Sequence, residues 1–144
     1  MMDNNISIGN AGEFFVAAEL ERRGLTASVL MRNTKDFDIL AINRETNNQY
    51  AIQVKTTTKK GWILSDKCER IEDDDIFYAF VRINGFEQPE FHIVPSKIVA
   101  NELKESHERW LSTLGKNGQL HNDNSIRTFS DADNKYLNKW DYLK

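Results

Sequence analysis

Two short apolar segments on either side of a turn-forming loop constrain the fold of this chain most. They cover residues 38–42 and 50–57, and the loop between them, 43–48, is rich in asparagine, threonine and charged residues that favour turns. Apolar and polar residues alternate along the second segment, which is typical of a half-buried strand. The two segments are therefore predicted to form a β-hairpin.

Helices are predicted from signals at their ends. The first extends from Asn10, its N-cap, to just before Gly24, which can end it in a left-handed conformation. Ser96 can cap a second helix over residues 97–114. A capping-box pattern that begins at Ser130 predicts a last helix at the end of the sequence.

Besides the hairpin, four short segments have the β-branched and aromatic composition that is typical of strands. They lie at residues 26–32, 61–64, 76–83 and 91–94. Strands and helices in this order predict a mixed α/β domain around one sheet, and the length of 144 residues suits a single domain over 1–144.

Composition excludes several classes of protein. Cys68 is the one cysteine, which rules out an internal disulfide and a zinc site built mainly from thiolates. The longest uninterrupted apolar run, 76–81, is too short to cross a bilayer. Residues 1–5 do not resemble the start of a secretory signal, so we expect a soluble, cytoplasmic protein with no membrane partner.

The charge is distributed unevenly. The net charge is -3, the wrong sign for a strongly basic nucleic-acid binder. Residues 1–60 nevertheless hold eight Lys or Arg against seven Asp or Glu, whereas 61–144 hold eleven against fifteen. Composition thus leaves a polyanionic ligand open for the N-terminal half, and we expect a homodimer partner or another subunit to complete any DNA-binding surface.

A row of polar residues on the second hairpin strand is the best candidate for chemistry. Strand geometry directs Ile52 and Val54 to one face, and it directs Gln53 and Lys55 to the other. The hairpin can bring Asp38, at the start of the partner strand, next to them. A carboxylate and an amide oxygen can hold Mg²⁺, and a lysine can place a cation beside the attacking water.

Glu13 has two explanations. On the first predicted helix it shares a sector with Val16 and Leu20, the side expected to face the sheet, where an acid needs a cation or another polar partner. The alternative is a capping box with Asn10, which requires no function. Glu19 lies on a more polar side and is predicted to be a solvated charge.

Together these residues resemble the motifs of the PD-(D/E)XK nuclease superfamily, especially its Holliday junction resolvase-like and Mrr-type restriction endonuclease-like members. The matching segments are Gly9-Asn-Ala-Gly-Glu13, Asp38-Ile-Leu-Ala and Gln53-Val-Lys55. The resemblance implies a restriction-endonuclease-like αβββαβ core, with a mixed sheet flanked by helices and with C-terminal helices. It also implies an endonuclease that hydrolyses nucleic-acid phosphodiester bonds, most readily those of DNA, with Mg²⁺ or Mn²⁺.

The resemblance implies a role for each matching residue. Asp38 corresponds to the central metal-binding acid, Gln53 to the second ligand position and Lys55 to the catalytic lysine. Glu13 corresponds to the glutamate on the first helix, which binds metal-linked water or a second ion. The main-chain carbonyl of Val54 is a further expected metal ligand.

Two positions depart from the family pattern. Phe37 stands where the motif has proline, and Gln53 stands where it has Asp or Glu. An amide oxygen brings one negative charge fewer, so weaker metal binding is expected. The alternative is a catalytically inactive module of the same fold that binds nucleic acid or a protein partner. Asp36 is an alternative to Asp38 as the metal ligand.

The residues that follow Lys55 are candidates for phosphate contacts. They are Thr56, Thr57, Lys59 and Lys60. The other explanation, a soluble strand end, is equally open. Trp62 can stack on a base, but a tryptophan on a strand is more often part of the core.

Overall fold

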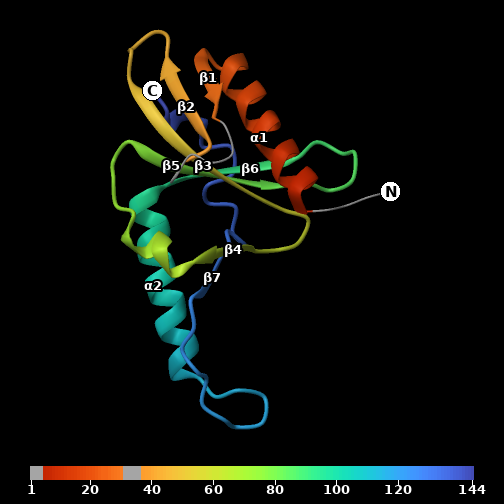
Figure 1. Cartoon of the computed structure of the whole chain (residues 1–144), viewed down its shortest axis with the longest axis vertical. Coiled ribbons are helices and arrows are strands. Elements are labelled where there is room, and N and C mark those ends of the chain that lie inside the picture. Colours follow the sequence, from red (N-terminus) through yellow and green to blue (C-terminus); the bar gives the residue numbers. More distant parts are fainter. Residues whose placement is uncertain (1–4, 31–36) are drawn as a thin grey trace.

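A five-stranded mixed sheet forms the centre of the structure (Figure 1). The structure is a computed structural model, and it describes residues 5–30 and 37–144. The strands lie in the order β1-β2-β3-β5-β6. Their bounds are Leu25–Val29 for β1, Ile39–Asn43 for β2, Gln49–Thr57 for β3, Ile76–Arg82 for β5 and Glu90–Pro95 for β6.

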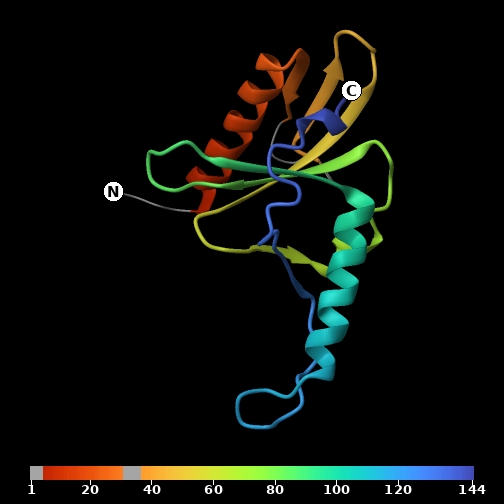
Figure 2. The same ribbon diagram turned by 180° about the vertical axis from the view of Figure 1, so that it is seen from behind.

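Different elements cover the two faces of this sheet. Helix α1 (Asn5–Arg22) packs on one face, and helix α2 (Ser96–Ser112) packs on the other. A small second sheet of β4 (Trp62–Ser65) and β7 (Ile126–Phe129) lies on the same side as α2. Figure 2 shows α2 extending well beyond the sheet. No helix in the described part of the chain has the length and apolarity needed to cross a membrane.

The predicted β-hairpin is confirmed, and β3 is its second strand. It pairs antiparallel with β2 only as far as Ile52, opposite Ile39, and it pairs parallel with β5 over its whole second half to Thr57. Ile52 and Val54 enter the core beneath α1, as the alternation predicted. Beyond Ile52, β3 therefore has a strand partner on one edge only, as far as residues 5–30 and 37–144 show.

The fold class predicted from the sequence is confirmed, with a difference in the crossover. The connection from β3 to the parallel strand β5 contains β4 and a short 3₁₀ helix, η1 (Asp66–Arg70), where the αβββαβ order has an α-helix. α2 instead follows β6. It begins at Ser96, one residue earlier than predicted, and Pro95 takes the N-cap position that was predicted for Ser96. The Ser96 hydroxyl instead donates to the Asp73 carbonyl at 2.6 Å.

Helix α1 begins earlier than predicted. It starts at Asn5, so Asn10 lies inside the helix and cannot form a capping box with Glu13. The end of the helix is as expected: Gly24 has a φ of 91°, and its N–H donates to the carbonyl of Glu21. The capping-box explanation of Glu13 is therefore wrong.

The predicted C-terminal helix is also wrong. Turns occupy most of residues 131–139, and what remains helical is the short 3₁₀ helix η2 (Trp140–Tyr142). Strand β7 ends at Phe129, just before the predicted helix, and it was not among the predicted strands. Asp131 accepts hydrogen bonds from the N–H groups of Lys135 and Tyr136, and its carboxylate lies 2.7 Å from His92 Nδ1 in the interior. These contacts hold the segment against β6. The side chains of Tyr136, Trp140 and Leu143 in this segment are buried.

A glycine sets how closely α1 approaches β3. A Cβ atom at Gly12 would lie 1.9 Å from Oγ1 of Thr56, far inside the contact distance. The Thr56 hydroxyl is buried there and has no hydrogen-bond partner among the described residues. The helix therefore rests directly on the strand that carries Gln53 and Lys55.

The substitution Gly12→Ala is expected to lower the free energy of unfolding by about 1–3 kcal/mol, because the added methyl overpacks this contact. Gly9→Ala is the matched control, since a Cβ there meets nothing within 4 Å. It should be neutral or stabilising by up to about 1 kcal/mol, because alanine is the better helix former. Urea denaturation measures both, and Thr56→Ala should rescue part of the Gly12→Ala loss. Equal stability of the two glycine variants would contradict the close packing.

Candidate functional site

Asp38 lies immediately before β2 begins, and it is bound to β3 in two ways. Its N–H donates to the carbonyl of Ile52 at 2.9 Å, and its Oδ2 accepts the N–H of Val54 at 2.7 Å. Ile39 is already the register partner of Ile52, so the pairing steps by one residue, as in a β-bulge. The carboxylate takes the place of a strand partner at the open edge of β3.

Gln53 and Lys55 lie on either side of Val54, the residue that Asp38 binds. They are in register with Tyr78 and Phe80 of β5, which point into the core on the α2 side of the sheet. Both side chains are half-buried. The N–H and C=O of a strand residue point to the same edge, so the Val54 carbonyl faces the same edge as the Asp38 carboxylate. The structure thus brings these predicted site residues together.

The ammonium group of Lys55 forms no hydrogen bond or ion pair with any residue in the described ranges. Other lysines of the chain are paired: Lys97 lies 2.6 Å from Asp74, and Lys104 lies 3.0 Å from Glu72. Lys55 is also less exposed than these two lysines. A half-buried ammonium without a carboxylate partner is suited to meeting an anionic ligand.

Glu13 approaches the site from the other side of the sheet. It follows Gly12, which packs on Thr56, and it is half-buried. The side chains of Gln53 and Lys55 point away from α1, so Glu13 can reach them only around the open edge of β3. Asp36, the alternative metal ligand, lies outside the described residues.

The prediction for Glu19 is wrong. This side chain is only about one-tenth exposed, and it pairs with Arg22 at 2.8 Å and closely with Arg23. Burial of a carboxylate requires such partners, because an unpaired charge loses its hydration. Arg23 also lies over the ring of Trp140, so the trio joins the end of α1 to the C-terminal segment.

Among the predicted phosphate-contacting residues, the hydroxyl of Thr56 is buried, whereas Lys59 and Lys60 are exposed. The hydroxyl of Thr56 is buried beneath Gly12, which does not fit a contact with phosphate. Thr57 Oγ1 accepts the N–H of Lys59 at 3.1 Å, and the side chains of Lys59 and Lys60 are exposed.

Trp62 belongs to the core, which was the second of its two explanations. It is 1% exposed, and its ring lies edge-on against His92. Its Nε1–H donates to the carbonyl of Val81 at 2.9 Å. A tryptophan enclosed in this way cannot stack on a base, so the base-stacking explanation is wrong.

The donor atoms around Asp38 fit a hard divalent ion. One carboxylate oxygen is taken by Val54, which leaves the other oxygen, the Gln53 amide oxygen and the Val54 carbonyl. Mg²⁺ and Mn²⁺ prefer these oxygen ligands. No group of three or more His, Cys, Asp or Glu side chains able to hold a metal occurs among the described residues. In the set of three donors above, Asp38 is the one charged ligand.

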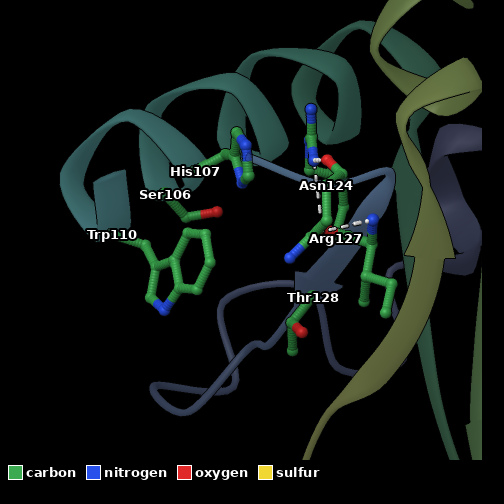
Figure 3. A pocket seen from close by; sticks show the side chains of 7 residues that line it. Ser106, His107, Trp110, Asn124, Arg127 and Thr128 are labelled. Atoms are coloured by element: carbon green, nitrogen blue, oxygen red, sulfur yellow. Dashed lines mark hydrogen bonds between the residues drawn. The ribbon is translucent and has the colours of Figure 1, made fainter. Parts of the chain in front are cut away.

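A separate hollow of about 390 Å³ lies between α2 and β7 (Figure 3). Trp110 stacks on His107, and His121 stacks on Trp110 at 4.1 Å. His107 also bonds Asp123 at 2.7 Å, which lowers the pKa of that carboxyl below its usual value. None of the residues that line this hollow belongs to the predicted set. No sequence motif marks it, because it joins a helix to a loop and strand that follow later in the chain.

Two solved structures resemble this one. A Holliday junction resolvase, Hjc, from Archaeoglobus fulgidus has a TM-score of 0.52 and 16% identity, over 86% of this chain and 84% of the resolvase. A bacterial homing endonuclease, I-Ssp6803I, has a TM-score of 0.56 and 12% identity, over 99% of this chain and 92% of the endonuclease.

Comparison of the sequence found no matching protein-family model and no matching curated protein. At such low identity the structural likeness concerns the fold. It agrees with the mixed sheet and with the flanking helices described above. The chain therefore has the restriction-endonuclease-like fold, which it shares with a resolvase and a homing endonuclease.

Proposed function

We propose that this protein is a divalent-metal-dependent nuclease that hydrolyses phosphodiester bonds of DNA. The observation that carries the proposal is the hydrogen bond from Val54 to Asp38, which fixes a carboxylate beside the residues that carry an amide and an ammonium group with no partner among the described residues. The fold supports it, because the similar structures are named as a Holliday junction resolvase and a homing endonuclease. DNA is taken as the substrate from those names.

Three groups would hold the ion in this proposal. They are the free oxygen of Asp38, the side-chain oxygen of Gln53 and the carbonyl of Val54. A bound Mg²⁺ or Mn²⁺ supplies a Lewis acid that lowers the pKa of water and offsets charge on the phosphate. Glu13 is an additional acid for a metal-linked water or a second ion, at the edge of β3.

Lys55 acts on the substrate directly in this proposal. Its ammonium orients the attacking water by a hydrogen bond and neutralises the negative charge that builds on the phosphoryl oxygens. A fixed cation in a half-buried site is more effective than one in water, because little solvent screens it.

The alternative function is an inactive nuclease-fold module that binds nucleic acid or a protein partner. Gln53 favours it, because the amide leaves Asp38 as the one charged ligand in the set of three. We also propose that a partner, either a second copy of the chain or another subunit, completes the DNA-binding surface, since a net charge of -3 leaves this chain no basic excess for a polyanion.

Lys55→Ala is expected to abolish Mn²⁺-dependent cleavage of circular DNA, a loss of about 100-fold or more, because it removes the cation that stabilises the transition state. Lys67→Ala is the matched control, since Lys67 is exposed on η1. Gel analysis of single- and double-stranded circles measures the rate. Thermal unfolding checks that both variants fold. Equal cleavage by Lys55→Ala and the wild type would refute the assignment.

Asp38→Asn is expected to weaken Mn²⁺ binding about tenfold or more, because it removes the charged ligand while an amide oxygen can still accept the Val54 N–H. Gln53→Glu should tighten binding, since it adds a charge. Isothermal titration with MnCl₂ measures both. Binding that appears only in Gln53→Glu would favour the inactive module. Unchanged affinity in Asp38→Asn would exclude Asp38 as the ligand.

A further inference from the structure

Arg82 lies at the end of β5, next to the part of β3 that leads away from the proposed site. It is the register partner of Thr57, and it lies on the same face of the sheet as Gln53 and Lys55. The guanidinium stacks over the ring of Trp62, with 4.8 Å between its carbon and the ring centre. No motif marked this arginine in the sequence.

Every nitrogen of the Arg82 guanidinium has a partner. Nε donates to the carbonyl of Lys59 at 2.7 Å, and one terminal nitrogen donates to the carbonyl of Lys60 at 2.6 Å. The other terminal nitrogen lies 2.5 Å from Glu90, which faces Arg82 from β6. Glu90 thus holds the guanidinium plane in place, and the plane holds two successive carbonyls.

These contacts fix the turn formed by residues 58–61, which connects β3 to β4. The hydrogen bond from the Lys59 N–H to Thr57 adds another fixed point. At the other end, a Cβ at Gly61 would lie 3.2 Å from Thr128, so that end packs against β7. The carbonyls of Lys59 and Lys60 are therefore bound to the protein, while their ammonium groups remain at the surface.

The position of the turn suits contacts with a nucleic-acid backbone. Thr57 follows Lys55 by two residues on the same face, a rise of about 6.6 Å along the strand. The turn begins directly after it, and Figure 1 shows β3 running into this turn near the start of α1. Nucleotides advance by about 3.4 Å along a duplex axis, so a phosphate held at Lys55 has neighbours within reach of the turn.

We propose that Arg82 is a positioning residue for substrate binding. It holds the 58–61 turn so that Lys59 and Lys60 contact the phosphates that flank the scissile one. The inference rests on the proposed nuclease function and adds to it the residues that determine affinity. We call Arg82, with its hydrogen bonds to the carbonyls of Lys59 and Lys60, the clasp. Preorganised lysines lose less conformational freedom when DNA binds, so the clasp strengthens binding without touching the substrate.

Arg44 is a matched control for this clasp. It also donates to a main-chain carbonyl, that of Glu21 at 3.2 Å, and it pairs with the Glu21 carboxylate at 3.0 Å. It lies on the loop between β2 and β3, at the opposite end of β3 from the turn. Arg44→Gln removes the same charge and the same kind of contact as Arg82→Gln, but away from the turn.

The test measures binding of a fluorescently labelled DNA duplex by anisotropy, in EDTA and from 50 to 200 mM NaCl, with the full chain. Arg82→Gln is expected to weaken binding about tenfold and to reduce the slope of log K against log salt by up to about 2, because two lysines no longer neutralise phosphates. Lys59→Ala with Lys60→Ala should show the same effects. Arg82→Gln in that double variant should add less than twofold.

The controls separate the outcomes. Arg44→Gln should change affinity and slope little, whereas Lys55→Ala should fail to cleave DNA. If Arg82→Gln loses stability on heating, Arg82→Lys gives the test instead, because it keeps the charge and removes the two-carbonyl geometry. If the wild type binds and cleaves DNA but Arg82→Gln leaves the slope of log K against log salt unchanged, the clasp alone is overturned. A wild type that neither binds nor cleaves DNA overturns both the clasp and the proposed function.

Discussion

The hydrogen bond between the Val54 amide and the Asp38 carboxylate determines what this sheet can do. Beyond the first residue of β2, the main chain of β3 would leave an N–H group without a partner, and an orphaned group of this kind costs stability when it is partly buried. A side-chain carboxylate fills the role instead. The same bond that completes the strand edge therefore fixes an acid at the point where two strands separate, and the proposed metal site follows from it.

The two cores of the protein hold β3 in place around that bond. Ile52 and Val54 pack beneath α1, and the opposite side of the sheet packs against Trp62 and α2. Gly12 allows α1 to rest on the strand itself. A strand fixed from both faces keeps Gln53 and Lys55 at constant positions, which is what a site needs if it is to stabilise a transition state by fixed charges. Beyond them, Arg82 extends this rigidity into the turn.

The features that could be predicted from the sequence are those that depend on residues close together in the chain. The hairpin and the grouping of Asp38 with Gln53 and Lys55 follow from alternation and a short loop, so they could be predicted. Strand β7 could not, because it forms by pairing with β4, far away in the sequence. Arg82 was missed for a similar reason: its partners are main-chain carbonyls, which no side-chain pattern records.

The central claim is that the edge of β3 beside Asp38 holds a divalent ion. Anomalous diffraction from a crystal soaked in MnCl₂ tests it most directly. The account predicts a peak within coordination distance of an Asp38 carboxylate oxygen and the Val54 carbonyl, with the Lys55 ammonium nearby. A well-ordered Asp38 with no peak beside it, or a peak confined to the acidic segment 72–75, would contradict it.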